Sequence, residues 1–173
     1  KKLVGAFGEQ VFEVIERRPE RLREIPGIGR GLAGRIAAAW AEQRAVRDIM
    51  LFLHSHGLSP LRASRIFATY GNRAIKVVSE NPYRLAQDIR GIGFASADEL
   101  AARLGIARDS PFRLVAGLAH VLEEAQSDGH CALPEDELIG RAEALLEVTA
   151  GQIEAALASE LQVGGLVRDS IDG

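Results

Sequence analysis

Cysteine is nearly absent from this 173-residue sequence, because Cys131 is its single cysteine and no disulfide can form within the chain. Aromatic residues make up only 5% of the chain, and no run of 18 or more apolar residues is present to form a membrane-spanning helix. No secretory signal opens the sequence. We therefore expect a cytoplasmic protein without a membrane partner.

The sequence also lacks the common motifs of catalysis. It contains no Gly-x-x-x-x-Gly-Lys-Ser/Thr loop for nucleotide phosphates, no Gly-x-Ser-x-Gly elbow and no His-Glu-x-x-His pair. His130 and Cys131 are neighbours, but no further zinc ligands stand at a recognisable spacing. We expect no catalytic residue, no metal and no cofactor in this stretch.

What the sequence does contain favours a mainly all-α fold, since it is rich in Ala, Leu, Arg and Glu. Its charges divide unevenly. Residues 1–105 hold 17 of the 21 Lys and Arg but 11 of the 24 Asp and Glu, a formal balance of +6, whereas residues 106–173 have a balance of −9. We predict two domains, 1–105 and 106–173, of which the basic one is suited to face phosphate.

The basic region contains a duplication. Residues 7–22 match residues 70–85 at an offset of 63, with aromatic-Gly, the apolar pattern, Pro and Leu in register. After one inserted residue the match resumes, where Ile25-Pro26-Gly27-Ile28-Gly29 aligns with Ile89-Arg90-Gly91-Ile92-Gly93. Two copies of one structural unit are therefore predicted.

A third, shorter relative lies between the two copies at Gly57-Leu58-Ser59, and all three share one template: Gly, an apolar residue, Gly or Ser, then Ala four residues later. The first Gly is expected to end a helix with a positive φ, where a Cβ would be strained. The third residue opens the next helix, and Ser59-Pro60 is a typical pair for the cap and the first turn. The template therefore predicts three helical hairpins.

Each hairpin would place unpaired backbone amides at a helix N-terminus, which favours an anion. The residues at Leu22–Gly29, with Ala33 and Ile36, closely resemble the helix-hairpin-helix element, and the resemblance implies contacts to DNA backbone phosphates without base readout. The predicted DNA-binding residues are Gly27, Ile28, Gly29, Arg30, Arg35, Gly57, Leu58, Ser59, Arg62, Arg65, Gly91 and Gly93.

The hairpin at Gly91 departs from the DNA-binding pattern, because Phe94 and Asp98 stand where that pattern favours Pro or Lys and neutral or basic residues. Phosphate contact by this hairpin is therefore left open. The alternative for all three hairpins is a purely structural role, or a site for a protein partner.

The acidic region is predicted to hold three helices and two short strands. Helices are expected at 112–127, at 134–146 and from a capping box at Thr149 to about Val163, with strands near 131–133 and 166–169. Asp172-Gly173 would begin a hairpin turn. This order predicts a small winged-helix-like domain with a truncated hairpin.

The whole order of motifs is similar to the N-terminal region of RecD-like DNA helicases, relatives of the exodeoxyribonuclease V α subunit. It includes Asn81-Pro82-Tyr83-Arg84-Leu85 and the segment from Ile89 to Asp98, followed by Gly129-His130 and Leu133-Pro134. The resemblance implies an ATP-dependent 5′-to-3′ helicase in DNA repair and recombination, with ATP and Mg in motor domains beyond Gly173. A first, leading hairpin is expected upstream of Lys1.

The partners that follow are DNA, through its backbone phosphates, the motor domains of the same chain and a protein partner for residues 106–173. The alternative function is a protein-interaction or structural docking module of a DNA-repair enzyme that does not itself bind DNA.

Overall fold

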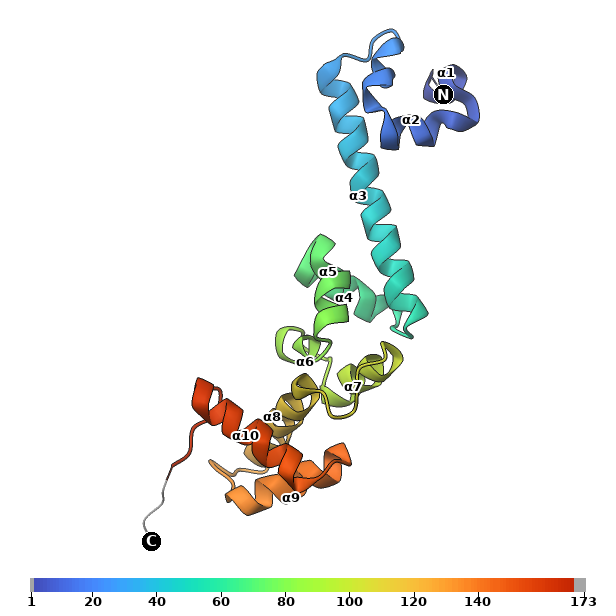
Figure 1. Cartoon of the computed structure of the whole chain (residues 1–173). Helices are drawn as coiled ribbons and strands as arrows, with labels where there is room; N and C mark the ends of the chain where they lie inside the picture. The colour runs from blue at the N-terminus through green and yellow to red at the C-terminus, as the bar shows by residue number, and fades with distance from the viewer. Residues whose placement is uncertain (1, 170–173) are drawn as a thin grey trace. The chain divides into compact units, whose positions relative to one another are not determined.

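The computed structural model describes residues 2–169, and all the regular structure in this range is helical (Figure 1). The chain divides into two compact units, residues 1–55 and residues 56–173. The all-α class predicted from the sequence is thereby confirmed. Within residues 2–169, no helix is both long and apolar enough to cross a bilayer.

The first unit consists of α1 (Lys2–Phe7), η1 (Gly8–Gln10), α2 (Val11–Arg17), η2 (Pro19–Glu24) and α3 (Arg30–Ser55), where η marks a 3-10 turn. Its core is formed by Val11, Val14, Ile15, Leu22 and Ala33. Trp40 on α3 packs against this core, stacks on Phe12 with ring centroids 4.9 Å apart, and donates a hydrogen bond to Glu16. These contacts hold α2 and η2 against the first half of α3.

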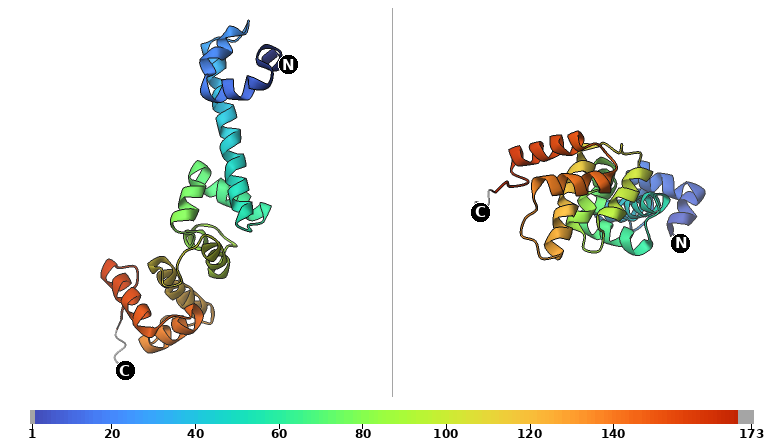
Figure 2. Two further views of the ribbon diagram at one scale, coloured as in Figure 1. Left: turned by 45° about the vertical axis from the view of Figure 1, so that its right-hand side comes forward. Right: turned by 90° about the horizontal axis from the view of Figure 1, so that it is seen from below.

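The second unit comprises α4 (Pro60–Tyr70), η3 (Gly71–Arg73), α5 (Ala74–Glu80), α6 (Arg84–Asp88), α7 (Phe94–Arg103), α8 (Pro111–Ser127), α9 (Glu135–Leu146) and α10 (Ala150–Val163). Helices α8, α9 and α10 pack on one another (Figures 1 and 2). Their core continues into the preceding helices, because Tyr83, Phe94, Ala97 and Ala101 belong to the same buried cluster as Leu118.

This shared core explains why packing does not follow the predicted division at residue 105. The structure separates the chain between Ser55 and His56 instead, inside the basic region. The third hairpin and the acidic helices are held by one set of buried side chains, so they form a single compact unit.

The duplication is visible in the backbone. Gly8 and Gly71 have φ of +54° and +55°, and each opens a 3-10 turn that leads into a seven-residue helix, α2 or α5. Leu22 and Leu85, which are equivalent, are both completely buried. Glycine is needed at the two turns because an L side chain is strained at these φ values.

In the acidic region, the three predicted helices are confirmed as α8, α9 and α10. The capping box is also present, with the Thr149 backbone N–H donating to Gln152 Oε1 at 3.0 Å. The predicted strands near 131–133 and 166–169 are wrong, since residues 2–169 contain no strand and these segments have no partner strand to pair with. The expected turn at Asp172-Gly173 lies outside the described residues.

Candidate nucleic-acid interface

The three predicted hairpins have the loop geometry that their template requires. We name them hairpin 1 (residues 25–29 with the start of α3), hairpin 2 (residues 56–59 with the start of α4) and hairpin 3 (residues 89–93 with the start of α7). Their first glycines, Gly27, Gly57 and Gly91, have φ of +92°, +81° and +89°. The apolar residue that follows each glycine turns inward: Leu58 and Ile92 are buried and Ile28 packs against the core of its unit.

Hairpin 1 has the most open helix N-terminus of the three. The first backbone bond of α3 runs from the Ala33 N–H to the Gly29 carbonyl oxygen at 3.0 Å, so the three preceding amides point beyond the helix end. Added Cβ atoms on Gly27, Gly29 or Gly31 would meet nothing within 4 Å. This exposed set of donors, at the positive end of a helix dipole, suits a phosphate oxygen.

Hairpin 2 has fewer free donors at the same place. Pro60 has no N–H, and the Arg62 N–H donates to the Ser59 hydroxyl at 3.4 Å, as expected for the N-cap predicted from the sequence. In the first turn of α4 this leaves the amide of Leu61 beyond the helix end. Hairpin 2 therefore offers an anion the side-chain charge of Arg62 more than its backbone amides.

Hairpin 3 turns the first residue of its helix into the protein. Phe94 is only 6% exposed and stacks on Tyr83 and His120, with ring centroids 5.9 Å and 5.2 Å apart. The departure from the DNA-binding pattern seen in the sequence thus corresponds to a packing role, because the aromatic ring joins the core shared with α8.

Asp98, the second departure, is the centre of a polar network. It accepts hydrogen bonds from Arg113 Nε and Nη2 at 2.8 Å and 3.0 Å and from the Tyr83 hydroxyl at 2.7 Å. Arg113 also donates to the Leu146 carbonyl oxygen at 2.7 Å, so one side chain links α7, α8 and the end of α9. Its own side chain is only 10% exposed.

The pKa values in this network follow from its geometry. Burial alone would raise the pKa of Asp98, but the hydrogen bonds from Arg113 and Tyr83 and the charge of Arg113 hold it below the usual value. Burial and the bond to Asp98 raise the pKa of the Tyr83 phenol, and the bond to Asp98 raises that of Arg113. At neutral pH, Asp98 and Arg113 are thus held in their charged forms and the Tyr83 phenol in its neutral form.

Arginines differ sharply between the predicted DNA-binding segments and the acidic helices. Within the described residues, Arg30, Arg35 and Arg62 have no carboxylate within ion-pair distance, and Arg30 and Arg35 are exposed. By contrast, every arginine of residues 106–169 is paired: Arg108 with Glu147, Arg113 with Asp98, Arg141 with Glu137 and Arg168 with Glu135. Free positive charge is therefore found beside hairpins 1 and 2.

Two further arginines contact the loops of the second unit. Arg65, a predicted DNA-binding residue, donates to the carbonyl oxygen of Arg90 at 3.3 Å, in the loop of hairpin 3. Arg103, which is not among the predicted residues, donates to the carbonyl oxygen of His56 at 3.0 Å, in the loop of hairpin 2. A contact over 47 positions has no local sequence signal, so only the fold identifies Arg103.

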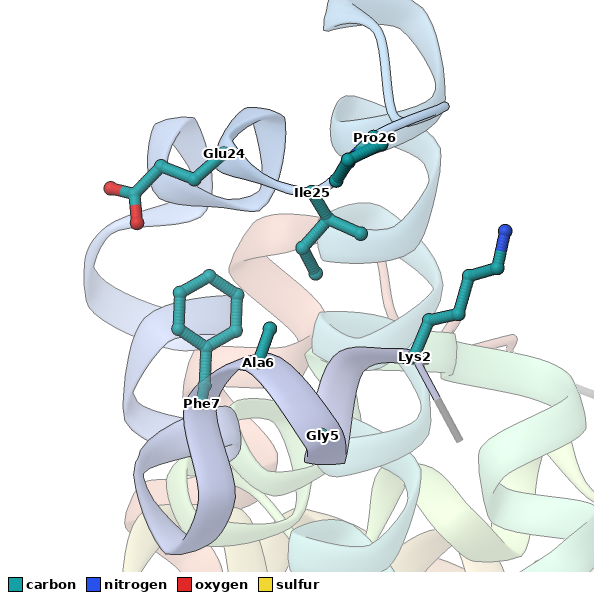
Figure 3. A pocket seen from close by; sticks show the side chains of 7 residues that line it. All are labelled: Lys2, Gly5, Ala6, Phe7, Glu24, Ile25 and Pro26. Carbon is teal, nitrogen blue, oxygen red and sulfur yellow. The ribbon is translucent and has the colours of Figure 1, made fainter.

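A pocket lies between α1 and the loop of hairpin 1, lined by Lys2, Gly5, Ala6, Phe7, Glu24, Ile25 and Pro26 (Figure 3). By the duplication, Lys2 is equivalent to Arg65 and Pro26 to Arg90. In the second copy the Arg65 guanidinium donates to the Arg90 carbonyl oxygen, so a cation and the hairpin loop meet there directly. Nowhere in residues 2–169 do three or more His, Cys, Asp or Glu side chains gather as metal ligands would.

Comparison with protein families matches residues 42–132, just over half of the chain, to the ATP-dependent RecD2 DNA helicase HHH domain. Among curated proteins, the chain is similar to the ATP-dependent RecD2 DNA helicase of Deinococcus radiodurans, at 28% identity over 169 residues. The match covers 97% of this chain and 24% of that protein, so the chain spans about a quarter of the relative's length.

Proposed function

The chain belongs to the HHH domain family of ATP-dependent RecD2 DNA helicases, and from this and the hairpin geometry we propose that it binds the backbone of DNA without reading its sequence. The observation that carries the proposal is hairpin 1. Its amides are open, and the nearby Arg30 and Arg35 have no carboxylate partner among the described residues. Amides orient a phosphate and arginines attract it, and neither distinguishes one base from another.

In this proposal, the predicted phosphate contacts are not equivalent. Gly27, Gly29 and Arg30 of hairpin 1 act through both backbone and charge, whereas hairpin 2 acts mainly through Arg62, because its cap and Pro60 occupy or remove amides. Hairpin 3 contributes least through its backbone, since Phe94 is buried at the start of α7. The predicted roles of Gly91 and Gly93 would then be to shape the loop.

The whole protein is proposed to be an ATP-dependent 5′-to-3′ helicase of DNA repair and recombination in the cytoplasm. Its ATP and Mg would bind motor domains outside this chain, and these domains would be partners of the chain. The acidic helices α8–α10 are proposed to dock against them or against another protein. The arginines of residues 106–169 all pair with carboxylates of the same chain, and Phe112 and Val163 expose 51% and 73% of their surfaces.

A salt titration tests DNA binding. We expect the chain to bind a mixed-sequence duplex with a dissociation constant of roughly 10⁻⁴ to 10⁻⁶ M, with log K falling linearly against log salt. Replacing both Arg30 and Arg62 by Ala should lower the salt slope by about two, because each removes one phosphate contact. The readout is fluorescence anisotropy of a labelled duplex.

The matched control is the double variant Arg21→Ala with Arg84→Ala. These arginines occupy equivalent positions in the two copies and each pairs with a carboxylate, Glu24 or Asp88. The control removes the same formal charge, yet should change the salt slope less. If the two double variants bind DNA equally well, the hairpins are structural and the docking module is the better explanation.

A further inference from the structure

Hairpins 2 and 3 each supply an arginine side chain that contacts the loop of the other. Arg103, at the end of α7 in hairpin 3, places Nη1 against Gly57, and a Cβ on that glycine would lie 1.2 Å from this nitrogen. Arg65, on α4 of hairpin 2, places Nη1 against Gly91, where a Cβ would lie 3.0 Å away. Each guanidinium thus lies directly on the glycine of the opposite loop.

These contacts leave donors unused. A guanidinium has five N–H groups. Arg103 donates from Nη1 to the His56 carbonyl oxygen and from Nη2 to Glu99 at 2.6 Å, so its position is fixed while other N–H groups remain. Its side chain is 44% exposed. Arg103 is therefore a preoriented cation at the loop of hairpin 2, where the backbone itself offers few donors.

The carboxylates near these loops are not equally available. Asp88 accepts from the Tyr70 hydroxyl at 2.7 Å and pairs with Arg84, and Asp98 is engaged by Tyr83 and Arg113. Glu99 is left as the carboxylate that faces Arg103, and it is 64% exposed. An anion arriving at the loop of hairpin 2 would compete with Glu99 for the same guanidinium.

We propose that Arg103 is a phosphate-binding residue of hairpin 2, supplied by hairpin 3, and that Glu99 weakens this contact by competing for it. The inference rests on the proposed DNA binding. It gives hairpin 3 a role that does not use its own helix N-terminus, because a side chain from its far end reaches the neighbouring loop. Hairpins 2 and 3 then form one composite phosphate site.

The test compares two matched pairs of variants in the 173-residue chain. Lys76 and Glu80 on α5 form an exposed ion pair four residues apart, as Glu99 and Arg103 do. The distance from Lys76 Nζ to Glu80 Oε1 is 3.8 Å. Arg103→Ala is compared with Lys76→Ala, and Glu99→Gln with Glu80→Gln, by anisotropy of a labelled duplex between about 50 and 200 mM salt. Circular dichroism establishes that each variant is folded.

Arg103→Ala should lower the salt slope by about one and weaken binding several-fold at the lower salt, whereas Lys76→Ala should leave the slope nearly unchanged. Glu99→Gln should tighten binding more than Glu80→Gln does. This second comparison decides the matter if Arg103→Ala does not fold, since it keeps the arginine.

Two results overturn the inference and can be told apart from failure of the proposed function. If the wild-type chain does not bind DNA, the proposed function and the proposed role of Arg103 are both contradicted. If the wild-type chain binds DNA but Glu99→Gln and Glu80→Gln change the affinity equally, or a folded Arg103→Ala behaves as Lys76→Ala does, Arg103 only braces the loop and the proposed function stands.

Discussion

Arg30 in the first copy of the repeat and Phe94 in the second hold the same position, the first residue of the helix after the hairpin. Arg30 is exposed and without a carboxylate partner in the described chain, whereas Phe94 is buried between two rings. Four residues later, Gly34 in the first copy corresponds to Asp98, which binds Arg113. Similar backbones therefore carry an open cationic face in one copy and an internal contact surface in the other.

The comparison shows how a duplicated unit acquires two roles without a change of fold. The buried positions Leu22 and Leu85, and Ile25 and Ile89, keep their apolar character because both units need a core. On the helix after the hairpin the two copies differ in charge, because Arg35 is replaced by Glu99. Reversing charge there costs little stability but changes what the surface attracts.

The largest expected effect comes from disrupting the internal contacts of Asp98 in the second copy, which should lower the stability of the fold. Asp98→Ala would leave the guanidinium of Arg113 buried without its carboxylate, so the free energy of unfolding should fall by about 3 kcal/mol. Urea unfolding followed by circular dichroism measures it. The control is Glu24→Ala, which removes the exposed partner of Arg21 and should leave the stability nearly unchanged. Equal losses would mean that the Asp98 network does not hold α7 to α8.

The same network predicts a pH dependence. Because the pKa of Asp98 is lowered in the folded chain, its ionised form stabilises the fold above the unfolded-state pKa of about 3.9, and this contribution is lost as the pH falls below that value. Asp98→Asn lacks the contribution at every pH. The stability difference between wild type and Asp98→Asn should thus be largest near neutral pH and shrink in acid. A difference that stays constant would contradict the pairing.

Glycine substitutions distinguish the cost of backbone strain from the cost of losing the contact between Arg103 and the loop of hairpin 2. Gly27→Ala and Gly57→Ala each place an L residue at a strongly positive φ, which costs roughly 1–2 kcal/mol. Only the second also displaces Arg103, whose hydrogen bond to the His56 carbonyl contributes about 1 kcal/mol more. Gly57→Ala should therefore be the more destabilising in thermal unfolding. The reverse order would show that Arg103 moves aside without cost.

Much of the fold was predictable because its signals are local. The positive φ of Gly27, Gly57 and Gly91, the Ser59 cap and the Thr149 capping box all depend on residues a few positions apart. The predicted strands were wrong for the opposite reason. A short apolar run such as Leu166-Val167 becomes a strand only if a partner strand is available, and the sequence near it does not show whether one is.

The candidate site divides in the same way. The loop residues, the exposed Arg30 and Arg35 and the partly buried Arg62 follow from the motif, and their contact with DNA stays a prediction. Long-range contacts could not be predicted from local sequence patterns, because the hydrogen bonds from Arg103 to His56 and from Arg113 to Leu146 join residues 47 and 33 positions apart. The boundary between the two compact units after Ser55 could not be predicted either, because it depends on which apolar side chains share a core and not on charge.

The smallest expected effect comes from making hairpin 2 more like hairpin 1. Ser59→Gly places at this position the residue that hairpin 1 has as Gly29, and it releases the Arg62 N–H from the serine hydroxyl. Exchanging a Ser cap for Gly costs only a few tenths of a kcal/mol, whereas Ser59→Ala should cost about 1 kcal/mol.

If backbone amides limit hairpin 2, Ser59→Gly should bind duplex DNA slightly more tightly than wild type, by about two-fold, because a freed N–H can donate to a phosphate oxygen. Anisotropy titration at low salt measures it, with Gly29→Ser as the reciprocal variant that should weaken hairpin 1. Tighter binding by Gly29→Ser would mean that a hydroxyl, and not a free amide, is the better phosphate donor at this position. The difference between hairpins 1 and 2 would then lie in their arginines alone.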